Sequence, residues 1–268
     1  YRIDRANNKR DYISPVQKKG EKPFRYNWQT PILLSSHNQE ILYMGSNFLH
    51  RSMNQGQTWT AISPDLTQGA KEGNVAFGTI AAISESPLQF GLLYTGSDDG
   101  LVHVSKDGGA TWNIISGNLP QNRWISRVVA SAHKKERVYV TLNGYRNDDF
   151  TTYVYMSDDF GQTWINIATN LPTSPVNVLV EDNVNEDVLY LGTDNGLYVS
   201  LNKGSLWNDF SNGIPNVAVH DLVIQKKAKD LVVGTHGRSI YKVNLEPVQQ
   251  LNEKVLAENL HVKKKKKI

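Results

Sequence analysis

The sequence predicts an all-β fold, a partial β-propeller of four-stranded antiparallel blades, and three observations support this. One eight-residue pattern begins at residues 52, 105, 157 and 200. The spacing between copies is close to the roughly 40 to 50 residues that the four short strands and turns of one blade need. An apolar run that ends in a turn precedes each copy, and a proline-containing linker follows three of them. A repeat of this period is typical of propellers.

The repeated pattern is Ser-x-Asp-x-Gly-x-Thr-Trp, seen in full at Ser105–Trp112 and Ser157–Trp164. The copy at Ser52–Trp59 has Asn in place of Asp, and the copy at Ser200–Trp207 is weaker. A short Asp or Asn side chain accepts backbone N–H groups in a turn, Gly takes a positive φ, and Trp packs into the blade. We interpret these residues as structural: Ser52, Asn54, Gly56, Trp59, Ser105, Asp107, Gly109, Trp112, Ser157, Asp159, Gly161 and Trp164. Asp107 and Asp159 are therefore not expected to form a catalytic pair.

The strands before each turn are rich in β-branched and aromatic residues. Several of them end at Asp-Gly or Asn-Gly, which favours hairpins. The second strands are predicted at 42–46, 93–100, 189–196 and 231–238, and the blade-opening strands at 31–36, 80–84, 127–132, 176–181 and 219–225. Linkers at 118–120, 170–172 and 213–215 contain proline, which cannot donate to a strand ladder. The sequence therefore predicts four full blades and a fifth that stops after its third strand.

The chain is divided accordingly into an N-terminal segment at 1–30, the propeller at 31–245, and a polar helix or disordered basic tail at 246–268. The formal net charge is +3, and five positive charges lie at Lys263–Lys267. The rest of the chain is therefore slightly acidic and is not expected to bind nucleic acid. The sequence has no cysteine, which excludes disulfides and thiolate metal sites. We expect no metal and no cofactor. We also expect no membrane span, since no apolar run of about 18 residues occurs.

The chain begins at Tyr1 without a signal-peptide pattern. We expect it to be a segment of a longer bacterial protein that is secreted or periplasmic, with the remaining blades as partners in that chain.

The sequence resembles the bacterial neuraminidase repeat, or Asp-box, superfamily across nearly its whole length. More closely, it is similar to bacterial sortilin-type propeller proteins, which are often labelled glycosyl hydrolases. The closer match is carried by 24–31 (FRYNWQTP), 83–87 (ISESP), 144–150 (GYRNDDF) and 234–238 (GTHGR). The superfamily includes sialidases, xyloglucan-cleaving enzymes and non-catalytic sorting receptors, so the resemblance implies the fold but not one activity. This chain lacks the cysteine-rich module of the receptors, and Phe24–Asn27 only partly matches the sialidase Phe-Arg-Ile-Pro motif.

A binding site is expected on the face opposite the Asp-box turns, around the mouth of the channel. Aromatic rings stack on sugars, and guanidinium groups grip carboxylates. The predicted binding residues are Arg25, Tyr26, Asn27, Trp28, Trp124, Arg127, Tyr145, Arg146, His236 and Arg238, and Asp194 and His220 are expected on the same face.

Several residues expected on this face also have a structural interpretation. Asp98-Asp99-Gly100 and Asp194-Asn195-Gly196 make good hairpin turns without a ligand, and Arg146 could pair with Asp148 or Asp149. His236 and Arg238 could be a structural pair that lines the channel, and residues 25–28 could plug it.

Two main functions follow from these residues, and a third, weaker interpretation is a scaffold inside a larger secreted protein. The first is a non-catalytic propeller that binds a protein, peptide or glycan through its channel face, because the sequence contains no nucleophile, zinc or phosphate-loop motif. The alternative is a glycoside hydrolase with a pair of carboxylates as acid and as base or nucleophile. The candidates for that pair are Asp98, Asp99, Asp148, Asp149 and Asp221.

Overall fold

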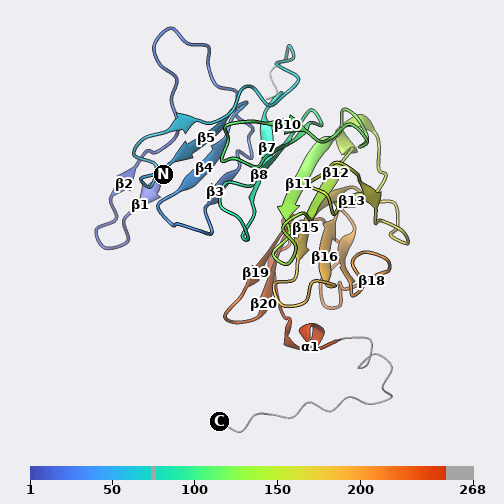
Figure 1. Cartoon of the computed structure of the whole chain (residues 1–268). Coiled ribbons are helices and arrows are strands. Elements are labelled where there is room, and N and C mark those ends of the chain that lie inside the picture. Colours follow the sequence, from blue (N-terminus) through green and yellow to red (C-terminus); the bar gives the residue numbers. More distant parts are fainter. Residues whose placement is uncertain (74–76, 252–268) are drawn as a thin grey trace, which may run out of the picture.

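The structure, a computed structural model, describes residues 1–73 and 77–251. Four antiparallel sheets have four strands each and a fifth has three, which confirms the predicted all-β propeller (Figure 1). Blades 1 and 2 are β3 (Ile32–Leu34), β4 (Leu42–Gly45), β5 (Leu49–Ser52), β6 (Thr60–Ala61), and β7 (Ile80–Glu85), β8 (Leu93–Ser97), β9 (Val102–Ser105), β10 (Asn113–Ile114). Blades 3 and 4 are β11 (Trp124–Ala130), β12 (Val138–Asn143), β13 (Tyr153–Ser157), β14 (Ile165–Asn166), and β15 (Val176–Glu181), β16 (Leu189–Thr193), β17 (Gly196–Ser200), β18 (Trp207–Asp209). Blade 5 is β19 (Val219–Gln225), β20 (Asp230–Thr235) and β21 (Ile240–Asn244).

Four short elements lie outside the five sheets. They are a hairpin of β1 (Arg2–Ile3) and β2 (Arg10–Asp11), the 3-10 helix η1 (Tyr145–Asn147) and the helix α1 (Glu246–Gln249). The predicted basic tail at Lys263–Lys267 lies outside the described residues. None of the helices in the described part of the chain is long and apolar enough to cross a membrane.

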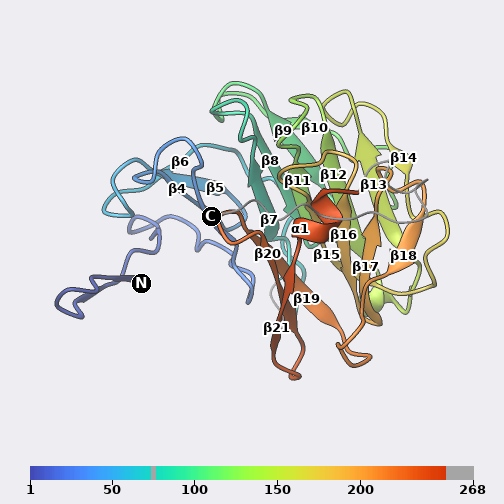
Figure 2. The same cartoon turned by 90° about the horizontal axis from the view of Figure 1, so that it is seen from below.

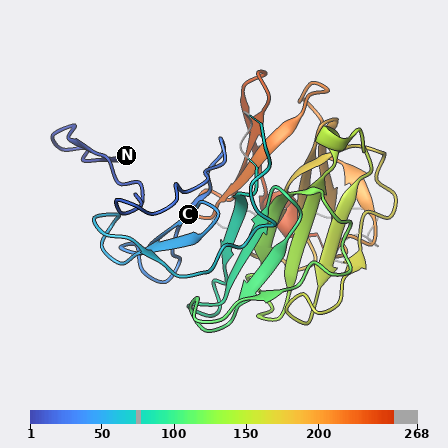
Figure 3. The ribbon, with the colours of Figure 1, turned by 90° about the horizontal axis from the view of Figure 1, so that it is seen from above.

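The blades follow one another in chain order. Figure 2 shows blades 1 to 4 from one side of the molecule to the other, with blade 5 returning toward the middle. The hairpin β1–β2 lies at the far end of blade 1, away from blade 5 (Figure 3). An ion pair between Arg127 in β11 and Asp221 in β19 joins blades 3 and 5 directly.

The hydrophobic core is divided among the junctions between consecutive blades. One cluster, with Tyr43, Leu49 and Ile80, joins blades 1 and 2, and three further clusters join the later pairs of blades. Alternating side chains of each strand face opposite sides of its sheet. Each interior blade therefore packs against a neighbour on both of its faces.

Buried carboxylates join two of these junctions in the same way. Glu85 of blade 2 accepts hydrogen bonds from Ser35 and Tyr43 of blade 1. Glu181 of blade 4 accepts equivalent bonds from Ser131 and Tyr139 of blade 3. Each interacting residue in the second pair of blades lies 96 positions after its counterpart in the first. This carboxylate junction therefore recurs at every second blade, whereas the Asp-box turn recurs in each of blades 1 to 4.

The junction between blades 2 and 3 differs. The position that matches Glu85 and Glu181 in strand register is Ala130. The buried Tyr94 hydroxyl at this junction has no hydrogen-bond partner among residues 1–73 and 77–251. A blade junction can therefore form with an apolar residue in place of the buried carboxylate.

The four Asp-box turns have one hydrogen-bond pattern. In the second copy, Ser105 Oγ donates to Asp107, the Gly109 amide donates to Ser105 Oγ, and the Thr111 amide donates to Asp107. The copies at Ser52, Ser157 and Ser200 make the same three contacts, with Asn54 and Asn202 in the place of Asp.

Each Asp-box tryptophan connects its blade to the preceding one through the indole N–H. The Nε1 atoms of Trp112, Trp164 and Trp207 donate to the carbonyl oxygens of Ile62, Ile115 and Ile167, at 2.9, 2.7 and 2.7 Å. Each of these isoleucines lies directly after the preceding blade's fourth strand.

Acid is expected to weaken the two turns that carry aspartate. Hydrogen bonds from Thr111 and Ser105 lower the pKa of Asp107 to about 2. Burial opposes the shift at Asp159, but Thr163 and Ser157 still lower its pKa to about 2. A carboxyl whose pKa falls on folding adds stability above its unfolded value, near 3.9, and loses that stability as the pH falls through the folded value.

The variant Asp107→Asn/Asp159→Asn copies the residues found naturally at 54 and 202. It should therefore lose less stability than the wild type between about pH 4 and pH 2. Urea unfolding at stepped pH measures this difference. Parallel pH profiles for the two proteins would show that these turns do not contribute to acid sensitivity.

Candidate functional site

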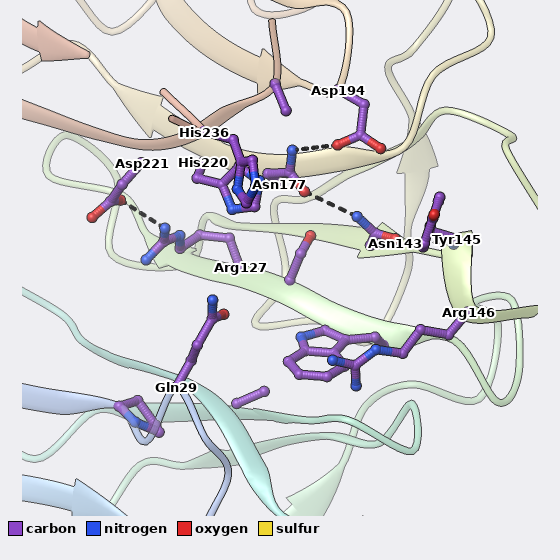
Figure 4. Close-up of a pocket in the computed structure, with 15 residues that line it drawn as sticks. Gln29, Arg127, Asn143, Tyr145, Arg146, Asn177, Asp194, His220, Asp221 and His236 are labelled. Atoms are coloured by element: carbon purple, nitrogen blue, oxygen red, sulfur yellow. Dashed lines mark hydrogen bonds and ion pairs between the residues drawn. The ribbon is translucent and has the colours of Figure 1, made fainter. Parts of the chain in front are cut away.

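A cavity of about 810 Å³ lies where the inner strands of blades 2 to 5 meet the segment that leads into β3. Its volume is within the range of small-molecule and peptide-side-chain pockets. The lining residues are Gln29, Pro31, Ala81, Trp124, Ser126, Arg127, Asn143, Tyr145, Arg146, Asn177, Asp194, Ala218, His220, Asp221 and His236 (Figure 4). Blade 3 contributes the largest share, and we call this cavity the channel-face pocket.

A cation stacked on an aromatic ring forms one wall of the pocket. The Arg146 guanidinium carbon lies 3.8 Å from the centroid of the Trp124 ring (Figure 4). Trp124 begins β11, and Arg146 lies in η1, the short helix after β12. Tyr145, beside Arg146, is exposed and meets Phe150 edge to face. The stack holds a charged group at the surface of the pocket while its planar face stays desolvated.

An ion pair spans the pocket between blades 3 and 5. Arg127 Nη2 lies 2.7 Å from Asp221 Oδ1, with side chains 35% and 59% exposed. An ion pair this exposed contributes little to stability. The Arg127 Nε atom is buried and has no hydrogen-bond partner in the described part of the chain. Arg127 therefore retains donor capacity beyond its bond to Asp221.

A chain of amides orients the carboxylate of Asp194. Asn143 Nδ2 donates to Asn177 Oδ1 at 3.0 Å, and Asn177 Nδ2 donates to Asp194 Oδ1 at 2.9 Å (Figure 4). These residues come from the ends of β12 and β15 and from the turn after β16. The second oxygen of Asp194 is not used in this chain of bonds.

Two histidines face each other at the blade 5 side of the pocket. The rings of His220 and His236 lie 5.0 Å apart between centroids, at an interplanar angle of 34°. Both side chains are exposed. The described residues contain no group of three or more His, Cys, Asp or Glu side chains that could hold a metal ion.

Six of the predicted site residues line this pocket together. They are Trp124, Arg127, Tyr145, Arg146, Asp221 and His236. Asp194 and His220, expected on the same face, also line it. The predicted pairing of Arg146 with Asp148 or Asp149 does not occur among the described residues, because Arg146 stacks on Trp124 and Asp149 pairs with Arg123.

Residues 25–28 are placed outside the pocket lining, although Gln29 follows them directly. Arg25 binds Asp65, Thr67 and the carbonyl of Gly78. Tyr26 donates to the Pro15 carbonyl, and Asn27 is buried. Trp28 is 81% exposed. Two of these four side chains, those of Arg25 and Asn27, therefore hold the N-terminal segment against the blades, while Tyr26 bonds within that segment. Arg238, also exposed, does not line the pocket.

Asp98 and Asp99 are buried and used by the fold. Asp98 accepts from the Thr79 amide and hydroxyl and from Asn27. Asp99 accepts from Ser97 and the Gln68 amide. Burial raises the pKa of Asp99, and the Ser97 hydrogen bond opposes the rise. Neither carboxylate reaches the channel-face pocket.

Asp148 and Asp149 also lie outside the pocket lining. Asp148 is exposed and caps η1 with a positive φ of 52°. Burial opposes the shift at Asp149, but hydrogen bonds from Arg123, Thr151 and Tyr153 hold its pKa well below its usual range. Of the five carboxylates suggested for catalysis, only Asp221 lines the pocket.

The sequence interpretation missed Gln29, Ser126, Asn143 and Asn177. Polar residues on inner strands give no turn or motif signal, so they are not distinguished from residues facing solvent. The pairwise blade repeat offers a signal for Asp194, which lies 96 positions after Asp98. Asp98 is covered by Asn27, whereas Asp194 remains at the pocket.

Comparisons with known proteins agree with the fold. A family model described as the DUF6242 beta propeller domain matches residues 33–241. A search of curated proteins finds no significant match.

Solved structures share the propeller fold at low sequence identity. The GH74 xyloglucanase from Xanthomonas campestris is 18% identical with a TM-score of 0.64, over 84% of this chain and 37% of that one. A GH74 enzyme from Niastella koreensis is 22% identical, with a TM-score of 0.57 over 77% and 35%. YCF48, solved with D1 peptide bound, is 13% identical, with a TM-score of 0.56 over 85% and 65%. This chain spans less than two thirds of each.

Proposed function

The chain belongs to the DUF6242 β-propeller domain family, and we propose that it is a non-catalytic binding propeller that holds a protein or glycan ligand in its channel-face pocket. The observation that supports this most is the convergence of polar and aromatic side chains from blades 3, 4 and 5, with Gln29 from the segment before blade 1, on one cavity of about 810 Å³. Within the proposal, the domain is part of a larger sortilin-like bacterial protein that is secreted or periplasmic.

The chemistry of the pocket favours a ligand that carries carboxylate groups. Arg127 and Arg146 both line the cavity, and guanidinium groups recognise carboxylates through paired hydrogen bonds. The Arg127–Asp221 pair is exposed enough to be exchanged for a ligand carboxylate at little cost. Trp124 and Tyr145 add ring surface for the apolar part of a peptide or sugar.

Binding is favoured over hydrolysis by how the pocket carboxylates are used. Asp194 accepts a hydrogen bond from the Asn177 amide, and Asp221 forms an ion pair with the Arg127 guanidinium. Asp98, Asp99 and Asp149 are engaged by the fold. The likeness to GH74 enzymes concerns the fold alone, and the peptide bound to YCF48 is a property of that protein.

Replacing Arg127 with alanine is expected to weaken binding of the ligand by about 10-fold to 100-fold, the effect of removing one hydrogen bond to a charged group. Peptide and glycan arrays identify the ligand, and calorimetry on the best hit measures the change. Arg238→Ala is the matched control, because that arginine is exposed and outside the pocket lining. Equal loss in both variants would mean that the ligand binds elsewhere.

A reducing-end release assay on glycan hits distinguishes the two functions. We expect binding without product release. Release that is abolished by Asp221→Asn or Asp194→Asn would overturn the binding proposal in favour of a glycoside hydrolase.

A further inference from the structure

The N-terminal hairpin has the strand register of the outer half of a blade. Arg2 pairs with Asp11 in β1 and β2, as Arg51 pairs with Thr60 in β5 and β6. Blades 2 and 3 repeat this pair as Val104 with Asn113 and Met156 with Ile165. In every case an isoleucine follows two positions later: Ile13, Ile62, Ile115 and Ile167.

The isoleucine after the hairpin is held as the others are. Trp59 Nε1 donates to the Ile13 carbonyl at 2.5 Å, matching the three contacts between later blades. A Cβ atom on Gly56 would lie 2.9 Å from Ile13, and Gly109, Gly161 and Gly204 meet Ile62, Ile115 and Ile167 as closely. The sequence Ile13-Ser14-Pro15 returns as Ile62-Ser63-Pro64. Residues 1–13 therefore occupy the place of the third and fourth strands of a blade before blade 1.

The first and second strands of that preceding blade, which would pack against β3, are not present among the described residues. Ile32 and Leu34 of β3 are each 61% exposed. The residues in matching register are buried in later blades: Val128 and Ala130 at 2% and 8%, Leu179 and Glu181 at 1% and 7%. In those blades the preceding blade covers these positions. Within the described residues, β1 pairs only with β2, so its other edge is open.

We propose that the open face of blade 1 binds a two-stranded β-hairpin, the inner half of a further Asp-box blade. The hairpin adds its second strand to the open edge of β1 and covers Ile32 and Leu34 with its first. The functional ring then holds at least one sheet more than the five whose inner strands are described. An exposed apolar strand of this kind is otherwise a site for non-specific association.

Leu34 determines which hairpin fits. Glu85 and Glu181 at the matching position accept hydrogen bonds from the preceding blade's tyrosine and serine, and leucine cannot. The face of the hairpin that covers Leu34 must therefore be apolar, or any tyrosine on that face must donate its hydroxyl to an acceptor within the hairpin itself. The hairpin β15–β16 does this, because Tyr190 donates to Asp182 of its own blade and packs in the cluster with Leu222 and Ile224 of blade 5.

The test adds such a hairpin to the chain. Residues 176–197 carry β15, β16 and the turn into the third strand, and Tyr198 occupies the register position of Tyr1. A second copy of 176–197 is joined directly to Tyr1. We expect the melting temperature to rise by about 5 °C and the binding of a hydrophobic dye to fall.

The control is Leu34→Lys in both proteins. It should remove the gain in the fused chain and leave the melting temperature of the unfused chain nearly unchanged, because Leu34 is exposed there. No gain, or a gain that survives Leu34→Lys, would overturn the proposal. A dimer of the unfused chain that Ile32→Lys/Leu34→Lys dissociates would also overturn it, since a second copy would then be the occupant.

If the fused chain does not fold, a peptide titration tests the proposal instead. Synthetic peptide 176–197 is added to the unfused chain, and dye displacement is followed. Displacement from the wild type but not from Leu34→Lys supports the proposal, and equal behaviour of the two proteins contradicts it.

Discussion

Replacing Glu181 with alanine is expected to lower the free energy of unfolding by about 3 kcal/mol or more. The carboxylate accepts hydrogen bonds from the Ser131 hydroxyl, the Tyr139 hydroxyl and the Ala132 amide. Ser131 and Tyr139 are each only 1% exposed, so water cannot replace the lost acceptor. A buried donor left unpaired costs about 1 to 3 kcal/mol. Two buried hydroxyls are left unpaired here, together with the half-buried Ala132 amide. Urea unfolding followed by tryptophan fluorescence measures the loss.

Glu85→Ala is the matched comparison for Glu181→Ala. Glu85 accepts from Ser35 and Tyr43 across the first blade junction, so one donor fewer loses its acceptor, and the loss should be smaller by about 1 kcal/mol. Tyr94 shows that one buried hydroxyl without a partner is tolerated by this fold. A loss below about 1 kcal/mol in both variants would show that these carboxylates contribute little to the junctions.

Replacing Gly192 with alanine is expected to destabilise the junction of blades 4 and 5 by about 1 to 3 kcal/mol, the usual range for overpacking a core. The added Cβ would lie 2.6 Å from Val178, 2.7 Å from the Val219 side chain and 2.9 Å from the Val219 carbonyl oxygen. One of these atoms is backbone, so relief requires β19 to move away from β16.

The same movement should also weaken ligand binding. Gly192 lies two residues before Asp194, and Val219 lies directly before His220, and both of these polar residues line the channel-face pocket. Gly117→Ala is the control, because nothing lies within 4 Å of a Cβ at that position. Thermal unfolding and calorimetry should show both effects in Gly192→Ala and neither in Gly117→Ala. A stable Gly192→Ala with normal binding would contradict the packing argument.

Much of the fold could be predicted from local sequence signals. The Asp-box turns depend on contacts within eight residues, such as Ser105 with Asp107 and Gly109, so the pattern is visible in a single copy. Because the turn recurs once per blade, its spacing also predicted the four sheets of four strands. The incomplete fifth blade followed from the strand pattern in the same way.

The candidate site could be predicted only in part. Trp124, Arg127, Tyr145 and Arg146 lie at strand ends and loops that the blade repeat places at the channel mouth. The run from Arg25 to Trp28 looked equally suitable in sequence. Arg25 and Asn27 reach partners 40 and 71 residues away, at Asp65 and Asp98, and no local pattern reports such contacts.

The sequence by itself therefore determined the blades, their turns and the order of their strands, because these depend on hydrogen bonds and packing between near neighbours in the chain. Tertiary structure alone decided which polar residues share the pocket, since Arg127 and Asp221 meet across 94 positions. It also decided which carboxylates are free and which face of blade 1 is open. Both depend on what covers a side chain, and a covering segment can come from anywhere in the polypeptide.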